Sequence, residues 1–295
     1  MGHFEQILAT LVEKALTDLA IPEDQIESAR GGIAQDIMAQ FTEEMRDDLL
    51  RRAPAILKRE RRDTQGFEKR NLERWRSAFD LVELIWIVAA ELGSNFNNEL
   101  RDQAQQDNDY LFEALTHLHA RALLVSNEAL CLMKGGFPDG ALSRWRTLHE
   151  HSVIAMFLKM HGSEAAHRYL ASFDFQALKS ARQMREYAER ARIELPSDAE
   201  IEYLEECCKR WTSKFYEEMR EEYGWTFPIL GKKRANLFDL EEATGLDHWR
   251  PRFRWASQHT HGQHRPAQAM LGVVESTTVS FSLAKAILVW LTHCR

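Results

Sequence analysis

The spacing of apolar residues constrains the fold of this chain most strongly, because it has the period of an α-helix almost everywhere. In the first segment, one helix face collects Phe4, Ile7, Leu8, Leu11, Val12, Ala15, Leu16 and Leu19. Apolar residues that recur three and four apart form one stripe of an amphipathic helix. We find no convincing alternation of apolar and polar residues, the pattern that predicts a strand. The sequence therefore predicts an all-α fold, and within that class a multi-helix bundle.

Two helices are predicted ahead of the bundle, as an N-terminal helical hairpin extension. Pro22 opens an acidic segment with its own apolar face, made of Ile33, Ile37, Phe41, Met45 and Leu49. Between residues 51 and 76 the charge reverses, with ten Lys or Arg against four Asp or Glu. Residues 64–66, Thr-Gln-Gly, have the composition of a break. The predicted domains are therefore an N-terminal amphipathic helical segment, 1–64, and a helical bundle domain, 65–295.

Each part of this N-terminal region has two interpretations. The two helices are either a surface for a protein partner or a small structural subdomain. The basic run is either a patch for nucleic acid or a solvated linker and helix face. The net charge of −7 argues against wholesale coating by nucleic acid, although a local basic site is compatible with it.

Beyond residue 71 the predicted helices are longer and more apolar. The run FDLVELIWIVAAEL favours a buried helix over a strand, because of its length and its flanking helical period. Gly135 and Gly136 form a helix stop signal, and Ser197 with Glu200 predicts a capping box. The predicted helical segments are, in order, 79–92, 109–136, 141–162, 163–193, 196–211, 249–261 and 270–293.

A loop-rich insertion near 223–248 separates the last two predicted helices from the rest. It contains Pro228, Gly231 and the basic cluster Lys232, Lys233 and Arg234. The segment is interpreted either as a mobile or ligand-facing element or as a plain surface loop.

Several features concern the compartment. No apolar run reaches the ~18 residues needed to span a bilayer, and the first residues lack the pattern of a secretory signal. The four cysteines include no C-x-x-C pair, which disfavours a disulfide framework and a cysteine-based zinc site. We therefore expect a cytoplasmic protein without membrane contact, metal or cofactor.

The first constellation with chemical potential is RWRTLHEH, residues 144–151. Arg146 and Glu150 stand four apart and share one helix face. Apolar neighbours cover more than one face of this helix, which predicts a central position. Because an isolated buried charge is costly, the pair is either an internal brace or the lining of a polar pocket where Arg146 clamps an anion. Two arginine–histidine pairs of short spacing also occur here, Arg144–His149 and Arg146–His151.

The second constellation is RWASQHTHGQHRPA, residues 254–267. On a helix, Arg254, Ser257 and His261 lie on one face. The pattern H-x-H-x-x-H lacks the glutamate of H-E-x-x-H and is a weak zinc signal. Arg254 could hold a phosphate, while His261 could move a proton to or from a 2′-hydroxyl or a leaving oxygen. The competing interpretation is that His261 is a satisfied core or interface histidine.

The stretch GGFPDGALSRWRTLHEHSVIAMFLKMHGSEAAHRYLASFDFQALKSAR resembles a bacterial helical family catalogued as domain of unknown function 5677. That family tends to show an R-x-x-x-E pair in a central helix, an Arg/Tyr-rich segment about twenty residues later, a lysine beyond it, and S-x-x-x-H near the end. The matching residues here are Arg146, Glu150, Arg168, Tyr169, Lys179, Ser257 and His261. The resemblance covers roughly residues 75 to 290.

This family is in turn distantly similar to the HEPN superfamily of helical bundles, many of which are metal-independent RNases of toxin–antitoxin and phage-defence systems. The resemblance implies such a ribonuclease, or another nucleic-acid-acting effector, that dimerises and acts on RNA. It assigns the acid/base role to His261 and the phosphate role to Arg254. The alternative is a non-catalytic helical interaction protein whose polar set is a structural brace and whose residues 1–64 bind a partner. The implied supporting pocket consists of Arg146, Glu150, Ser257, His151 and Lys179.

Overall fold

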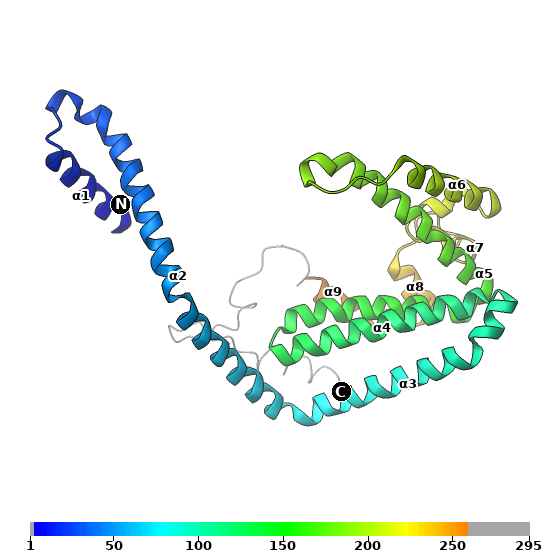
Figure 1. The fold of residues 1–295 in the computed structure, drawn as a ribbon. Helices are drawn as coiled ribbons and strands as arrows, with labels where there is room; N and C mark the ends of the chain where they lie inside the picture. The colour runs from blue at the N-terminus through cyan, green and yellow to red at the C-terminus, as the bar shows by residue number, and fades with distance from the viewer. Residues whose placement is uncertain (1–2, 259–295) are drawn as a thin grey trace. The chain divides into compact units, whose positions relative to one another are not determined.

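The computed structural model describes residues 3–258, with all their side chains except those of 3–8, 24, 28, 44 and 45. Every regular element within these residues is helical, which confirms the predicted all-α fold (Figure 1). The elements, with 3-10 helices marked η, are α1 (His3–Asp18), η1 (Glu23–Gln25), α2 (Ile26–Arg74), α3 (Arg76–Asp107), α4 (Tyr110–Gly135), α5 (Pro138–Ala191), α6 (Asp198–Lys214), η2 (Glu217–Arg220), η3 (Gly224–Thr226), α7 (Phe227–Leu230), α8 (Leu237–Thr244), η4 (Asp247–Trp249) and α9 (Arg250–Ser257).

The chain divides into two compact units, with the boundary between Arg70 and Asn71. The expected break at residues 64–66 does not occur, because α2 continues through it to Arg74. A single glycine in a helix costs only about 1 kcal/mol relative to alanine, and the surrounding Arg, Lys and Glu residues are good helix formers. The helical conformation is interrupted instead at Trp75, whose φ and ψ are −113° and 18°.

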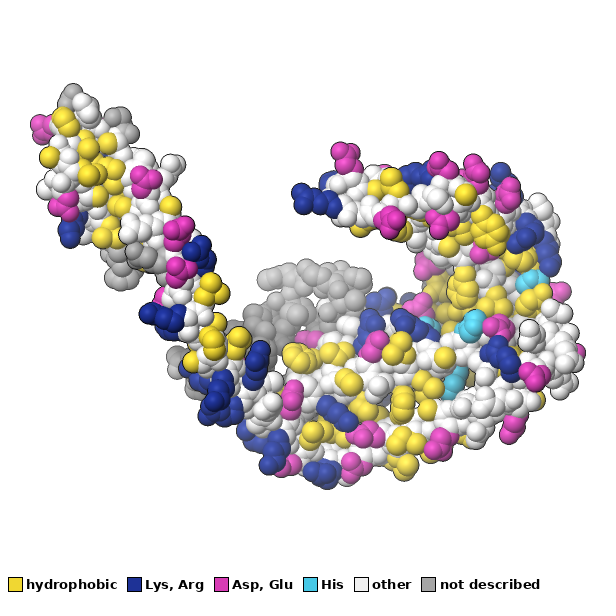
Figure 2. Space-filling view, viewed as in Figure 1, with side chains coloured by type: hydrophobic (Ala, Val, Ile, Leu, Met, Phe, Trp, Pro, Cys, Tyr) yellow, Lys and Arg dark blue, Asp and Glu magenta, His cyan; other side chains and the backbone are white. Residues whose placement is uncertain are grey.

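The first unit contains the predicted helical hairpin. Val12 and Leu16 of α1 are buried, and Glu13 of α1 forms an ion pair with Arg30 of α2 at 2.5 Å. The later part of α2 carries the basic run, whose arginines are exposed from Arg51 to Arg62. Figure 2 shows these basic side chains gathered along the lower half of α2.

Helix α5 is the centre of the second unit, as its apolar surroundings predicted. It packs against α4 and α6, and its first part also contacts α8 and α9. Figure 1 shows α4 running alongside the first part of α5. Val153, Phe157 and Leu158 have no exposed surface. Burying each of these side chains contributes about 1.5–3 kcal/mol, so this stretch of α5 anchors the core.

Gly162 interrupts α5, as the predicted helix end at this glycine required. Its φ of +74° and ψ of −165° are not helical. Residues other than glycine rarely adopt this backbone conformation. The first part of α5 therefore ends here, and a second helical part continues to Ala191.

Local capping explains where the other helices begin and end. The Asp109 side chain accepts hydrogen bonds from the first turn of α4, and Gly136 ends that helix with a φ of +87°. The predicted capping box of α6 is present, because Ser197 and Glu200 each accept a hydrogen bond from the other's backbone N–H. A second capping box, from Asn236 and Asp239, opens α8. Such caps satisfy N–H groups that the helix itself leaves free.

The prediction that residues 79–92 form a buried helix was right about the helix and wrong about burial. Only Phe79 of α3 is buried. The opposite face exposes apolar side chains four residues apart, Leu84, Val88, Leu92, Phe96 and Leu100. Within the described residues α3 packs chiefly against one neighbour, α4, so one face stays uncovered. None of the helices between residues 3 and 258 has the apolar run that a bilayer span needs.

The segment after Tyr223 consists of short helices rather than open loop, and its start is part of the core. Trp225 is 2% exposed and Thr226 is fully buried, so the surface-loop interpretation fails for residues 223–226. A Cβ on Gly224 would overlap the carbonyl oxygen of Glu218 in η2. Backbone cannot move aside as a flexible side chain does, so this close approach requires glycine.

The variant Gly224→Ala should therefore lose about 3 kcal/mol or more of unfolding free energy, because the added methyl overlaps backbone. Gly231→Ala is the matched control. Its φ is +66° and nothing lies within 4 Å of the added carbon, so only about 1 kcal/mol of backbone strain is expected. Chemical denaturation of both variants measures the difference, and equal losses would contradict the proposed overlap.

Candidate functional site

The candidate site lies where the first part of α5 meets residues 223–226, α8 and α9; we call it the α5–α9 seam. Arg146 and Glu150 both face this seam, one turn apart on α5. They take separate partners, since no ion pair between them is found among the described residues. Arg146 and Glu150 therefore lie at the same site, as predicted, but they do not form a direct Arg–Glu ion pair.

The charged group of Arg146 packs on an aromatic ring. Its guanidinium carbon lies 4.8 Å from the ring centroid of Phe253 in α9, a cation–π contact. Its Nε is buried without a hydrogen-bond partner. Among the described residues Arg146 has no carboxylate partner either. A half-buried guanidinium without a carboxylate partner can bind an anion, because charge-assisted hydrogen bonds from a guanidinium to an anion are strong.

Glu150 is held by tyrosine. The Tyr223 hydroxyl donates to Glu150 Oε1 at 3.0 Å. Burial raises the pKa of Tyr169 to about 12, and the nearby Glu150 carboxylate adds to the rise. Burial and the same carboxylate raise the pKa of Tyr223 still further. Both phenols therefore stay protonated near neutral pH and serve as donors or packing surfaces around Glu150.

A buried ionic network joins three helices beside this pair. His149 Nε2 donates to Glu241 Oε1 at 2.9 Å, since a carboxylate only accepts. Arg250 Nη1 donates to the same oxygen at 3.2 Å and lies 3.1 Å from Oε2, which has no hydrogen bond of its own. Glu241 is fully buried and His149 is 7% exposed. The network therefore ties α5, α8 and α9 together.

Aromatic rings frame this network. The Phe253 ring lies under both Arg146 and Arg250, the second at 5.1 Å from the centroid. It also contacts the His149 ring, with centroids 5.6 Å apart. Trp145 stacks on the His149 ring at the same centroid separation. Phe253 thus fixes two guanidinium groups and one imidazole from a single position in α9.

The α9 residues of the predicted site lie at the edge of the seam. Arg254 is exposed, one residue after the buried Phe253. The Ser257 hydroxyl donates to the Phe253 carbonyl at 2.8 Å, which satisfies it within the helix. His261, the predicted acid/base, lies outside the described residues, as do His259 and His264. The predicted Arg254–His261 pairing therefore stays a prediction.

The structure places two other predicted residues away from the seam. His151 is two residues beyond His149, a turn of about 200° around the helix, and it faces a groove between α3, α4 and α5. Burial there lowers the pKa of His151. Lys179 is exposed on the second part of α5, where it lines a small hollow with Arg182 and Arg220.

The Arg–Tyr pair of the sequence resemblance does reach the seam. Arg168 is buried, and its Nε donates to the Trp225 carbonyl at 3.1 Å. The Tyr169 ring packs edge-on against the Trp225 ring at 5.1 Å. Since Tyr223 binds Glu150, residues 223–226 connect the two parts of α5. No cluster of three or more His, Cys, Asp or Glu side chains placed to hold a metal occurs between residues 3 and 258.

Sequence reasoning missed Glu241, Arg250 and Tyr223. Glu241 and its second partner, Arg250, lie 92 and 101 residues beyond His149 along the chain. The one available signal was the Asn236–Asp239 capping box, which predicts a helix start just before Glu241. That signal places Glu241 on a helix, but it does not identify the helix it faces.

Comparison with protein families gives one match over more than half of the chain. The family, described as "Family of unknown function (DUF5677)", matches residues 112–277, a narrower range than the expected 75 to 290. The matched range contains α5, α8 and α9, and so the whole α5–α9 seam. Neither the curated proteins nor the solved structures contain a match.

Removing the central carboxylate should unfold this region. Glu241→Ala leaves the half-buried Arg250 and the buried His149 without their acceptor, and breaking a buried ion pair costs about 3–5 kcal/mol. Glu242→Ala is the matched control, because Glu242 is the next residue of α8 and is exposed. Thermal unfolding of the two variants measures the difference. A Glu241→Ala protein as stable as the control would show that the network is dispensable.

The raised tyrosine pKa values predict that the free energy of unfolding falls at alkaline pH. Tyr169 keeps its proton up to about 12 when folded, whereas its ordinary value is 10.0. Its contribution to stability is thus complete below pH 10 and is lost as pH rises through about 12. Tyr169→Phe should show a shallower fall in unfolding free energy across this window. Denaturant titrations at several alkaline pH values test this, and identical slopes would contradict it.

Proposed function

The chain belongs to the family of unknown function DUF5677, and on this premise we propose that it is a metal-independent ribonuclease, or a related nucleic-acid-acting effector, of a bacterial stress or phage-defence system. The proposed substrate is RNA, the proposed assembly is a homodimer, and the proposed compartment is the cytoplasm. The proposed site is the α5–α9 seam together with His261, whose part in the proposal rests on the sequence.

The observation that carries the proposal is the unpaired guanidinium of Arg146. Glu150, one turn away, could have neutralised it but is occupied by Tyr223. The Phe253 ring contacts the guanidinium, and Nε still lacks an acceptor. Because a partly buried charge without a counter-ion is costly, the arrangement favours an anionic ligand. A phosphodiester offers oxygens that suit a guanidinium fork.

Arg254 adds a second positive charge on the exposed side of α9. In the proposed reaction, Arg146 and Arg254 hold the non-bridging oxygens of one phosphate and offset the charge that grows on them. His261 takes the proton from the neighbouring 2′-hydroxyl, and the 2′-oxygen then bonds to phosphorus. The bond to the 5′-oxygen breaks, and that oxygen takes a proton from water as it leaves. The products are a 2′,3′-cyclic phosphate end and a 5′-hydroxyl end.

A second candidate, a non-catalytic interaction protein, is favoured by a different observation. The His149–Glu241–Arg250 network and the Glu150–Tyr223 hydrogen bond are closed within the protein. Groups that already satisfy each other brace the helices, and they leave Arg146 as the open member of the seam. On this view residues 1–64, or another exposed face, would bind a partner.

Cleavage of RNA in the presence of a metal chelator distinguishes the two candidates. His261→Ala should lower the cleavage rate about 10²–10⁴-fold, and Arg146→Ala about 10²–10³-fold. Arg144→Ala is the matched control on the same helix, because Arg144 is paired with Glu128 at 3.3 Å and should leave the rate unchanged. Cyclic phosphate ends on the products would identify the reaction.

Growth arrest on expression gives the same comparison in cells. The wild type and Arg144→Ala should arrest growth, while His261→Ala should not. Thermal unfolding of each variant excludes misfolding as the cause of a lost effect. Equal arrest by wild type and His261→Ala, or intact RNA with every variant, would refute the ribonuclease and leave the interaction protein.

A further inference from the structure

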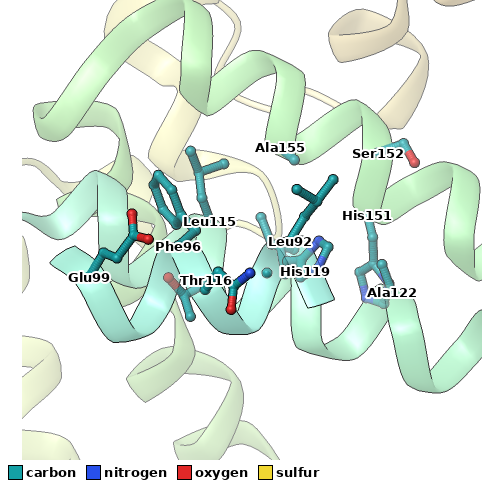
Figure 3. Close-up of a pocket in the computed structure, with 13 residues that line it drawn as sticks. Leu92, Phe96, Glu99, Leu115, Thr116, His119, Ala122, His151, Ser152 and Ala155 are labelled. Atoms are coloured by element: carbon teal, nitrogen blue, oxygen red, sulfur yellow. The ribbon is translucent and has the colours of Figure 1, made fainter. Parts of the chain in front are cut away.

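A groove of about 790 Å³ lies on the side of α5 opposite the seam, between α3, α4 and α5 (Figure 3). It continues the exposed apolar stripe of α3, because Leu92 and Phe96 belong to both. At 64% and 49% exposed, these two side chains have much of their apolar surface in water. The side chains that define the groove are Leu92, Phe96, Leu115, His119, His151 and Ala155.

One nitrogen inside this groove also lacks a partner. His151 Nδ1 is buried with no hydrogen bond, whereas His119 Nε2 across the groove bonds to the Ala89 carbonyl at 3.0 Å. A contiguous apolar face of this kind marks a surface that another element covers.

The last part of the chain has the composition that such a groove accepts. Residues 270–293 contain only two formal charges, Glu275 and Lys285, and five serine or threonine residues between 276 and 282. At helical spacing one face collects Val274, Phe281, Ala284, Leu288 and Leu291. This face spans 18 residues, or roughly 25 Å at 1.5 Å per residue, and the α3 stripe from Leu84 to Leu100 spans 17, about the same length.

The connection is long enough to reach the groove. α9 packs on the His149 side of α5, and the groove opens on the His151 side of the same turn. A path half-way around a helix about 11 Å across is roughly 17 Å. Eleven residues separate Gln258 from Met270, and at 3.3 Å or more per residue they extend to about 35 Å.

We propose that residues 270–293 form an amphipathic helix that docks along the α3 stripe and into the groove between α3, α4 and α5 of the same chain. One contact then removes both apolar surfaces from water. A segment attached to the chain has an effective concentration in the millimolar range, which a second copy or a foreign partner reaches only at high concentration. Docking would also hold the histidine-rich residues 259–264 between two fixed ends.

Hydrogen–deuterium exchange of the full chain tests this docking through two variants of equal solvent exposure. Leu92→Arg places a charge in the groove, while Leu50→Arg places the same charge on α2, and both leucines are 64% exposed. Amides 274–291 should exchange at least about tenfold faster in Leu92→Arg than in wild type. They should be unchanged in Leu50→Arg. Leu288→Arg should free the segment in the same way with the groove intact.

Three results would overturn the proposal. Amides 274–291 that exchange freely in wild type would mean that nothing covers the segment. Protection that persists in Leu92→Arg would mean that the segment is covered elsewhere. Protection that disappears on dilution, together with a halving of the mass measured by light scattering, would assign the groove to a second copy.

Discussion

The second unit depends on a buried carboxylate. Glu241 has no exposed surface, and its position is fixed by His149 from α5 and Arg250 from the start of α9. Taking these groups out of water is costly, and only their mutual contacts offset that cost. The short helices α8 and α9 have eight residues each, too few to be stable alone. The network, with Phe253 beneath it, therefore sets where α9 can lie.

Arg146 differs from its neighbours because it has no polar partner among the described residues. His149, Glu150, Glu241 and Arg250 each have a partner of suitable chemistry inside the seam, whereas Arg146 has only the face of an aromatic ring. A site prepared for an anion needs such a group, because a guanidinium already bound to a carboxylate must break that bond first. The closed contacts tie α5, α8 and α9 together, and under the proposed function Arg146 is the group that binds the anion.

Periodicity and capping predicted the local structure well, because both act within a few residues. The end of α4 at Gly136 and the start of α6 at Ser197 follow from the sequence. The central position of α5 follows from it as well. The uncovered face of α3 could not be predicted, because an apolar stripe does not reveal how many neighbours a helix has. Arg146 and Glu150 were recognised as a site, but their separate partners were not. Tyr223 and Phe253 come from distant segments whose pairing no local pattern encodes.

The unbroken first part of α5, from Pro138 to Gly162, has a consequence for how related chains can differ in length. Each helical residue turns the axis by about 100°. Insertion or deletion of one residue between Glu150 and Phe157 would rotate the seam away from α8 and α9 while the core side chains stay in place. Chain length can vary with little effect in the exposed connection 193–195 between α5 and α6, but not within this stretch. A relative that has gained or lost a residue there should have a different arrangement of side chains at this seam.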